Sequence, residues 1–216
     1  MNTKRIVFWL IFAVVIILIV WGLIVAMNKP PKGSSFGIPA PVTLADHVTG
    51  PANASVTMIE YSDFQCSACE NYYPLIERLI SESSATLRVV YRQFPLSQHA
   101  NAMPAAMASE AAGAQGKFWE MYRELFSNHT DWTELANPTD VFVGYATKIG
   151  LDIPKFKADM GSSTLRDFVN AQENEGISLG IDATPTFFVN GKAIVNPESY
   201  DQFKAIVDSA AQASVK

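Results

Sequence analysis

The sequence predicts an α/β fold that carries an inserted run of helices and is preceded by one transmembrane helix. An apolar, β-branched stretch at 56–59 and an alternating stretch at 86–92 flank a segment with helical spacing. Strand, helix and strand in this order form a βαβ unit, which implies parallel pairing. Residues 97–179 then show helical spacing without a strand pattern, and a continuous apolar run at 6–27 precedes the whole domain.

The apolar run at 6–27 predicts a membrane anchor. It is long enough, at about 33 Å for a helix, to span a bilayer. Trp9 and Trp21 lie near its ends, where indole rings favour the membrane interface. Two basic side chains within residues 1–5 favour a cytoplasmic N-terminus, so the domain would lie on the extracytoplasmic side. A cleaved signal peptide is the alternative, although its apolar region usually spans about 7–15 residues.

Residues 28–41 are rich in Pro, Gly and Ser, lack an apolar period and predict a flexible linker. The folded domain is expected at 42–210, entered through a turn-rich stretch at 46–51. The formal net charge is −5, yet the first 32 residues contain four basic and no acidic side chains. The rest of the chain is therefore strongly acidic, which excludes the basic surface of a nucleic-acid-binding protein.

Two cysteines, Cys66 and Cys69, are the only ones in the chain, and they lie where the first strand gives way to a helix. The reactive form of a cysteine is the thiolate. Cys66 would face the unpaired N–H groups and the positive dipole end of that helix, which stabilise a thiolate. Cys69 would lie one turn further along, shielded and able to close a disulfide. Ser67 and Ala68 form the dipeptide between them.

Glu60 is a third candidate, six residues before Cys66 and near the end of an apolar strand. A desolvated carboxylate has a raised pKa and can exchange protons with a buried thiol. The alternative is a Glu60 side chain that is solvated at the end of the strand.

Other uses of the cysteine pair fit the sequence less well. A disulfide between residues i and i+3 closes a short loop and stabilises a fold little. A zinc site needs about four ligands, and the chain has no second Cys-x-x-Cys. His47, His99 and His129 are scattered without ligand spacing. We therefore expect no metal and no cofactor. His99 could line the site, but a solvated position at the start of a helix is the expected one.

The spacing of apolar residues predicts the helices and strands that follow the βαβ unit. The helical segments expected within the insertion are 100–114, 118–126, 139–149, 154–160 and 165–179. Strands at 187–189 and 192–195, joined by Asn190–Gly191, predict a hairpin with a tight turn, and a helix at 199–210 closes the chain. Met103, Met107, Trp119, Tyr122 and Phe126 are expected in the core rather than on an apolar substrate surface.

The segment from Glu60 to Pro74 resembles the active site of the thioredoxin superfamily, and specifically of the DsbA-like thiol:disulfide oxidoreductases. The stretches Tyr91–Trp119 and Gly180–Lys192 resemble the same family, so the likeness covers roughly residue 41 to the C-terminus. The resemblance implies a thioredoxin-like fold with a helical insertion at about 97–179. It also implies a cis Pro185 beside the cysteines, with the backbone of Thr184 free to pair with substrate; a trans proline is the alternative.

This resemblance implies a function as well. The protein would introduce disulfides into exported proteins with free cysteines, and a quinone-linked thiol oxidase of the membrane would reoxidise it. The best-known DsbA proteins carry a histidine between the two cysteines, whereas Ser67–Ala68 brings no charge. A reductase or isomerase of the same fold is therefore an alternative. A non-catalytic, tethered chaperone or peptide-binding module is a third reading.

Overall fold

The structure is a computed structural model of the 216-residue chain that describes residues 36–214 together with 9, 12 and 16. Apart from those three positions, the predicted anchor at 6–27 lies outside the described residues, as do residues 1–5 and 28–35. No helix within the described part is both long and apolar enough to cross a bilayer. The chain divides into two compact units, 1–35 and 36–216, of which the second contains every element below.

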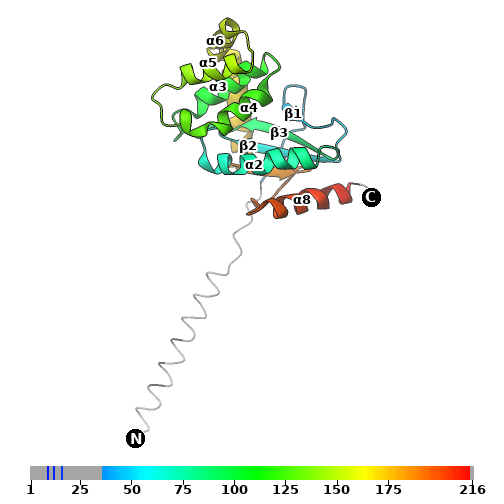
Figure 1. The fold of residues 1–216 in the computed structure, drawn as a ribbon. Helices are drawn as coiled ribbons and strands as arrows, with labels where there is room; N and C mark the ends of the chain where they lie inside the picture. The colour runs from blue at the N-terminus through cyan, green and yellow to red at the C-terminus, as the bar shows by residue number, and fades with distance from the viewer. Residues whose placement is uncertain (1–8, 10–11, 13–15, 17–35, 215–216) are drawn as a thin grey trace. The chain divides into compact units, whose positions relative to one another are not determined.

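A five-stranded mixed sheet in the order β1-β3-β2-β4-β5 forms the centre of this unit (Figure 1). The central strand β2 (Val56–Ser62) pairs in parallel with β3 (Leu87–Gln93) and antiparallel with β4 (Thr186–Val189). The two edges are β1 (His47–Thr49), antiparallel to β3, and β5 (Lys192–Ala193), antiparallel to β4.

Eight helical segments complete the described fold. The helix α2 (Ser67–Glu82) connects β2 to β3, and α8 (Tyr200–Ala213) follows β5. Between β3 and β4 the chain forms a helical insertion, whose members α3 to α6 gather away from α8 (Figure 1). The segments of the insertion are α3 (Ala102–Gly113), α4 (Phe118–Ser127), the 3₁₀ turn η1 (His129–Asp131), α5 (Thr139–Lys148), α6 (Ile153–Met160) and α7 (Ser163–Ser178).

Local chemistry accounts for several of these boundaries. The side chains of Asp152, Ser162 and Ser199 accept hydrogen bonds from backbone N–H groups three residues later and cap α6, α7 and α8. Asn190 and Gly191 have positive φ values of 47° and 77°, as a tight two-residue hairpin turn requires.

The structure differs from the sequence-based expectation at both edges of the sheet. The stretch at 46–51 was expected as turns only, yet it contains β1, because three residues are too few to show a periodic pattern. The last strand ends at Ala193 rather than at residue 195, so the hairpin is shorter than expected.

The apolar core has three main parts, and the cysteines lie in one of them. One face of the sheet packs on α2 and α8, and the other face packs on the segment after α7 and on Phe36. Within the insertion, Tyr122, Phe126 and Trp132 form an aromatic cluster that includes both Cys66 and Cys69. The expected core set agrees with this, since Met107, Tyr122 and Phe126 are buried and Met103 and Trp119 are partly buried.

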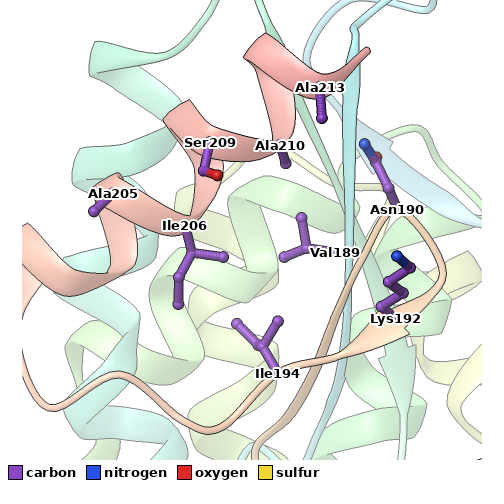
Figure 2. Close-up of a pocket in the computed structure, with 9 residues that line it drawn as sticks. All are labelled: Val189, Asn190, Lys192, Ile194, Ala205, Ile206, Ser209, Ala210 and Ala213. Carbon is purple, nitrogen blue, oxygen red and sulfur yellow. The ribbon is translucent and has the colours of Figure 1, made fainter.

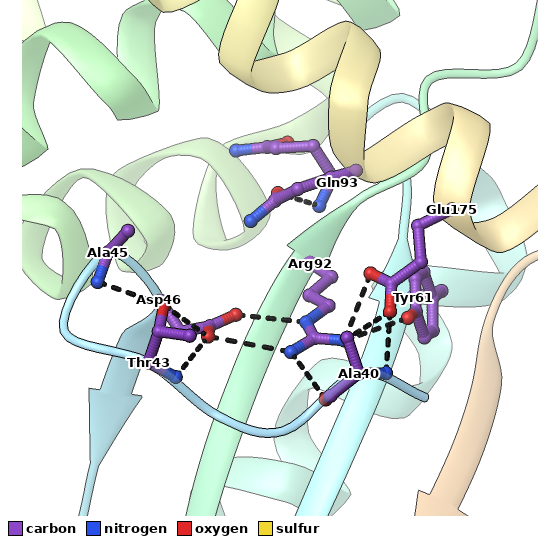
Figure 3. Close-up of polar contacts among 9 residues, drawn as sticks. Ala40, Thr43, Ala45, Asp46, Tyr61, Arg92, Gln93 and Glu175 are labelled. Carbon is purple, nitrogen blue, oxygen red and sulfur yellow. Dashed lines mark hydrogen bonds and ion pairs between the residues drawn. The ribbon is translucent and has the colours of Figure 1, made fainter. Parts of the chain in front are cut away.

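The buried side chain of Arg92 connects β3, α7 and the segment before β1 (Figure 3). Arg92 on β3 forms ion pairs of 2.9 Å with Asp46 and with Glu175 on α7. It also donates to the carbonyl oxygen of Ala40 at 3.1 Å and to the hydroxyl of Tyr61 at 3.0 Å. The segment that leads into β1 is thus fixed against both the sheet and the insertion.

Replacing this arginine tests the role of the cluster. Arg92→Met should lower the free energy of unfolding by about 3 kcal/mol, because it leaves two acidic partners in a largely buried setting without a counterion. Urea denaturation measures the effect. Arg78→Met is the matched control, since the Arg78–Glu82 pair lies on the exposed surface of α2 and should shift the midpoint much less. Equal shifts in the two variants would contradict this account.

Candidate active site

The position of Cys66 follows from the start of α2. Cys66 is the N-cap residue, with an extended backbone, and its carbonyl oxygen accepts from the N–H of Glu70 at 3.0 Å. Its side chain makes no capping hydrogen bond, so it does not saturate the N–H groups of the first turn. These N–H groups and the dipole of α2 favour a negative charge at this sulfur.

The pKa of the Cys66 thiol is lowered from its ordinary value to about 5. The first cause is a hydrogen bond from the Cys69 thiol, which the burial of Cys66 opposes. The Thr184 side chain and the backbone N–H groups of Ala68 and Cys69 add to the lowering. Cys66 therefore exists mainly as a thiolate at neutral pH, which is the nucleophilic form.

Cys69 has the opposite environment. Its side chain is fully buried, and burial raises the pKa of its thiol well above the ordinary value. The negative charges of Cys66 and Glu60 raise it further. The pair thus divides into an outer thiolate and an inner thiol, while Ser67 and Ala68 between them are exposed.

Glu60 lies on β2, in register with Tyr91 on β3 and Phe187 on β4. It is only 1% exposed, and neither carboxylate oxygen has a hydrogen-bond partner among the described residues. Burial raises the pKa of this carboxyl to about 7, and the nearby Ser62 hydroxyl offsets part of the effect. A carboxyl that titrates near neutral pH, and whose charge acts on the pKa of Cys69, can take up or release the proton of the inner thiol.

The loop before β4 completes the surroundings of Cys66. The peptide bond between Thr184 and Pro185 is cis, and the carbonyl oxygen of Thr184 lies 3.6 Å from the sulfur of Cys66. Asn196 donates to the carbonyl oxygen of Pro185 at 2.8 Å and fixes the loop from the other side. The structure therefore brings Thr184 and Pro185 next to Cys66, from a segment 118 residues further along the chain.

Asp63, which the sequence analysis did not single out, anchors the loop that precedes Cys66. Its buried carboxylate accepts from the backbone N–H groups of Gln65 at 2.7 Å and Leu96 at 2.9 Å. His99 Nδ1 lies 2.6 Å from the same carboxylate. The expectation of a solvated His99 at the start of a helix is wrong, because this pairing holds a largely buried ring in the turn before α3.

Gln65 connects the cysteine segment to the insertion. Its side-chain oxygen accepts from the N–H of Asn101 at 2.6 Å, and its side-chain amide donates to the carbonyl oxygen of Thr133 at 2.7 Å. Its backbone carbonyl oxygen lies 3.0 Å from Nε2 of His129. The signal available in the sequence was the presence of two polar residues, Asp63 and Gln65, among the three that precede Cys66, but their partners become visible only in the fold.

An apolar groove elsewhere on the domain has a different character. It lies between the β4–β5 hairpin and α8, has a volume of about 480 Å³ and includes the polar side chains Asn190, Lys192 and Ser209 (Figure 2). None of its lining residues belongs to the cysteine site, and it contains no thiol and no carboxylate. The groove is therefore separate from the cysteine site at the start of α2.

A family model described as thioredoxin matches residues 43–209. Among solved structures, BdbD from Bacillus subtilis superimposes with a TM-score of 0.73 at 21% identity, covering 83% of this chain and 98% of that chain. Alpha-DsbA1 from Wolbachia pipientis does so with a TM-score of 0.70 at 21% identity, covering 81% and 94%. The predicted likeness to DsbA-like proteins is confirmed at the level of the fold.

Curated relatives match over a shorter part of their length. The Na(+)/H(+) antiporter NhaA 1 of Mycolicibacterium gilvum is 38% identical over 152 residues, which are 68% of this chain and 24% of that protein. The NhaA 1 protein of Salinispora arenicola is 37% identical over 168 residues, 76% of this chain and 24% of that protein. The chain spans about a quarter of the length of these relatives, so the likeness concerns one segment of each.

The raised pKa of the buried Glu60 carboxyl predicts how the stability of the folded protein depends on pH. Because the pKa of Glu60 is about 7 in the folded state and near 4.5 when unfolded, the folded protein holds its proton more tightly between these values. Wild-type stability therefore falls as pH rises through this window. Glu60→Gln should gain stability relative to wild type by about 3 kcal/mol between pH 4.5 and pH 8.

Urea denaturation of the reduced proteins across this pH range measures the difference, and the titration of Cys66 largely cancels because both proteins contain it. Glu134→Gln, at an exposed position, is the control and should show no such trend. A difference between Glu60→Gln and wild type that stays constant with pH would show that Glu60 titrates normally.

Proposed function

This chain belongs to the thioredoxin family, and we propose that it is a thiol:disulfide oxidoreductase that introduces disulfides into exported proteins. The observation that carries the proposal is the asymmetry of the two thiols. Cys66 caps α2 beside an exposed dipeptide and has a lowered pKa, whereas Cys69 is buried behind it and has a raised pKa. An outer leaving group and a shielded inner thiol are what disulfide donation needs.

The reaction begins with the disulfide form of the pair. A substrate thiolate attacks the sulfur of Cys66, the Cys66–Cys69 bond breaks, and a mixed disulfide between Cys66 and the substrate forms. Cys69 leaves as a thiolate and takes up a proton from Glu60, whose pKa near 7 suits the transfer.

A second substrate thiolate then attacks the substrate sulfur of the mixed disulfide. The new substrate disulfide forms, and Cys66 leaves as a stabilised thiolate. The substrate loses two electrons and two protons, and the enzyme retains the electrons as one thiol and one thiolate. Glu60 regains its proton from solvent, so charge and atoms balance over the cycle.

Substrate binding is proposed at the loop of Thr184 and Pro185. Proline has no N–H, and the backbone of Thr184 lies against the sulfur of Cys66, so an extended substrate segment can pair with this loop while its cysteine reaches Cys66. This binding mode recognises the substrate backbone rather than its side chains, so it suits a range of unfolded substrate proteins.

The location and partners are proposed on sequence grounds. An anchor at residues 6–27 would hold the domain on the extracytoplasmic side of the membrane, where thiols are not kept reduced by glutathione. A quinone-linked thiol oxidase in the same membrane would return the pair to its disulfide form, and the shared membrane would raise the rate of encounter. No cysteine other than Cys66 and Cys69 is present to trap a mixed disulfide.

A reductase or isomerase is the second candidate, favoured by the uncharged dipeptide Ser67–Ala68. The two directions differ in reduction potential. We expect the full-length protein in detergent, equilibrated with glutathione buffers and followed by thiol trapping, to have a potential nearer about −120 mV than about −270 mV, as a strong oxidant does. A reduction potential near about −270 mV would reverse the proposed direction of the reaction and favour the reductase.

Two serine variants distinguish catalytic thiol exchange from substrate binding alone. Cys66→Ser should abolish oxidation of a reduced unfolded substrate, and so should Cys69→Ser, which cannot form the Cys66–Cys69 disulfide. With a substrate that already contains a disulfide, the Cys66 thiolate of Cys69→Ser should attack one sulfur, release the other as a thiolate and accumulate as a mixed disulfide, because no inner thiol is present to resolve it. Exchange at the wild-type rate by Cys66→Ser would contradict the mechanism and favour a non-catalytic, peptide-binding module.

A further inference from the structure

Each of the three histidines lies against a carboxylate, although they are scattered along the sequence. The pairs are His47–Glu110 at 2.8 Å, His99–Asp63 at 2.6 Å and His129–Glu70 at 3.2 Å. Only His129 contacts the segment on both sides of the cysteine pair. Its Nε2 lies 3.0 Å from the carbonyl oxygen of Gln65, directly before Cys66, and its Nδ1 faces Glu70, directly after Cys69.

The two partners of His129 are both hydrogen-bond acceptors. A backbone carbonyl oxygen and a carboxylate have no proton to donate, so each ring nitrogen faces a group that can only accept. Only the imidazolium form has an N–H for both of them. The residue is buried, and its ring packs edge-on against Trp132 at 5.7 Å, whereas the Glu70 side chain that faces Nδ1 is 37% exposed.

The insertion holds this ring firmly in place. His129 begins the 3₁₀ turn η1, and the indole N–H of Trp132 donates to the carbonyl oxygen of Leu125 at 3.0 Å. Gln65, which accepts from His129, is itself fixed by Asn101 and Thr133. A charge on the imidazole is therefore held at a fixed place beside the N-terminus of α2.

The charges that face His129 are those of the redox segment. Glu70 from α2 lies against Nδ1, and Cys66 follows the residue that accepts from Nε2; Asp131 lies on the same 3₁₀ turn. The positive end of the α2 dipole opposes an imidazolium, and the Glu70 carboxylate and the Cys66 thiolate offset it. Reduction of the disulfide adds the thiolate, so the imidazolium interacts more favourably with the reduced form than with the disulfide form.

We propose that His129 is a positioning residue for the redox pair, whose imidazolium supplies from the helical insertion the positive charge that Ser67–Ala68 lacks. It stabilises the Cys66 thiolate and thereby makes the disulfide more oxidising. This inference rests on the proposed thiol exchange and adds to it a residue outside the Cys-x-x-Cys segment.

The test compares His129→Gln with His47→Gln in full-length protein in detergent. Glutamine keeps one donor for the Gln65 carbonyl but has no charge. We expect His129→Gln to shift the equilibrium with glutathione toward the disulfide by about fivefold or more, on the scale of a cation at a helix end. His47→Gln removes an equivalent ring, one that pairs with Glu110 and stacks on Phe118, and should leave the equilibrium close to wild type.

A second measurement distinguishes the loss of the His129 charge from a change in the structure of the site. The ultraviolet absorbance of the Cys66 thiolate, followed against pH in the reduced proteins, should have a higher midpoint in His129→Gln and an unchanged midpoint in His47→Gln. An unshifted equilibrium, an equal shift in both variants, or a shift without a change in the thiolate midpoint would overturn the proposal.

Two further outcomes are distinguishable. If His129→Gln does not fold, His129→Asn takes its place and should also shift the equilibrium toward the disulfide; an unshifted equilibrium in that variant would overturn the proposal. If wild type itself does not exchange with glutathione, the proposed function fails. If wild type exchanges and His129→Gln matches it, only the role of His129 fails.

Discussion

The site depends on one electrostatic arrangement, in which the sulfur of Cys66 lies at the unpaired N–H groups that begin α2 while Cys69 lies one turn deeper in an apolar cluster. The first environment favours a thiolate and the second favours a thiol. The difference arises because Cys66 accepts hydrogen bonds from the Cys69 thiol and from backbone N–H groups, whereas Cys69 is more deeply buried and lies near the charges of Cys66 and Glu60. Every other group in the site either strengthens this contrast or keeps α2 in the position that creates it.

The sheet and the insertion contribute to the site in different ways. The sheet supplies Glu60 from its central strand, buried and without a hydrogen-bond partner among the described residues, and the loop of Thr184 and Pro185 that borders Cys66. The insertion supplies polar contacts to the loop before α2, through His99 and His129. The helical insertion therefore does more than cover the cysteines, since it fixes the segment from which they extend.

Local patterns were sufficient to predict much of this structure. The strand, the two cysteines and the helix are consecutive in the chain, so Cys66, Cys69 and Glu60 could be placed together from the sequence, and the helices of the insertion show clear apolar spacing. Contacts over long separations could not be predicted this way. His99 and Asp63 are 36 residues apart, and His129 and Gln65 are 64 residues apart. Both histidines lacked any local sign of a partner, and β1 was too short to show a period.

Cys66 is a thiolate at neutral pH without a histidine in the dipeptide, and this property of the site can be measured. The most direct measurement is the rate of Cys66 alkylation by iodoacetamide in the reduced full-length protein, followed from pH 3 to pH 10. We expect a midpoint near the pKa of about 5 that the arrangement gives Cys66, with Cys69 remaining unmodified. A midpoint at the ordinary thiol value of about 8.5, or alkylation of both cysteines together, would contradict it.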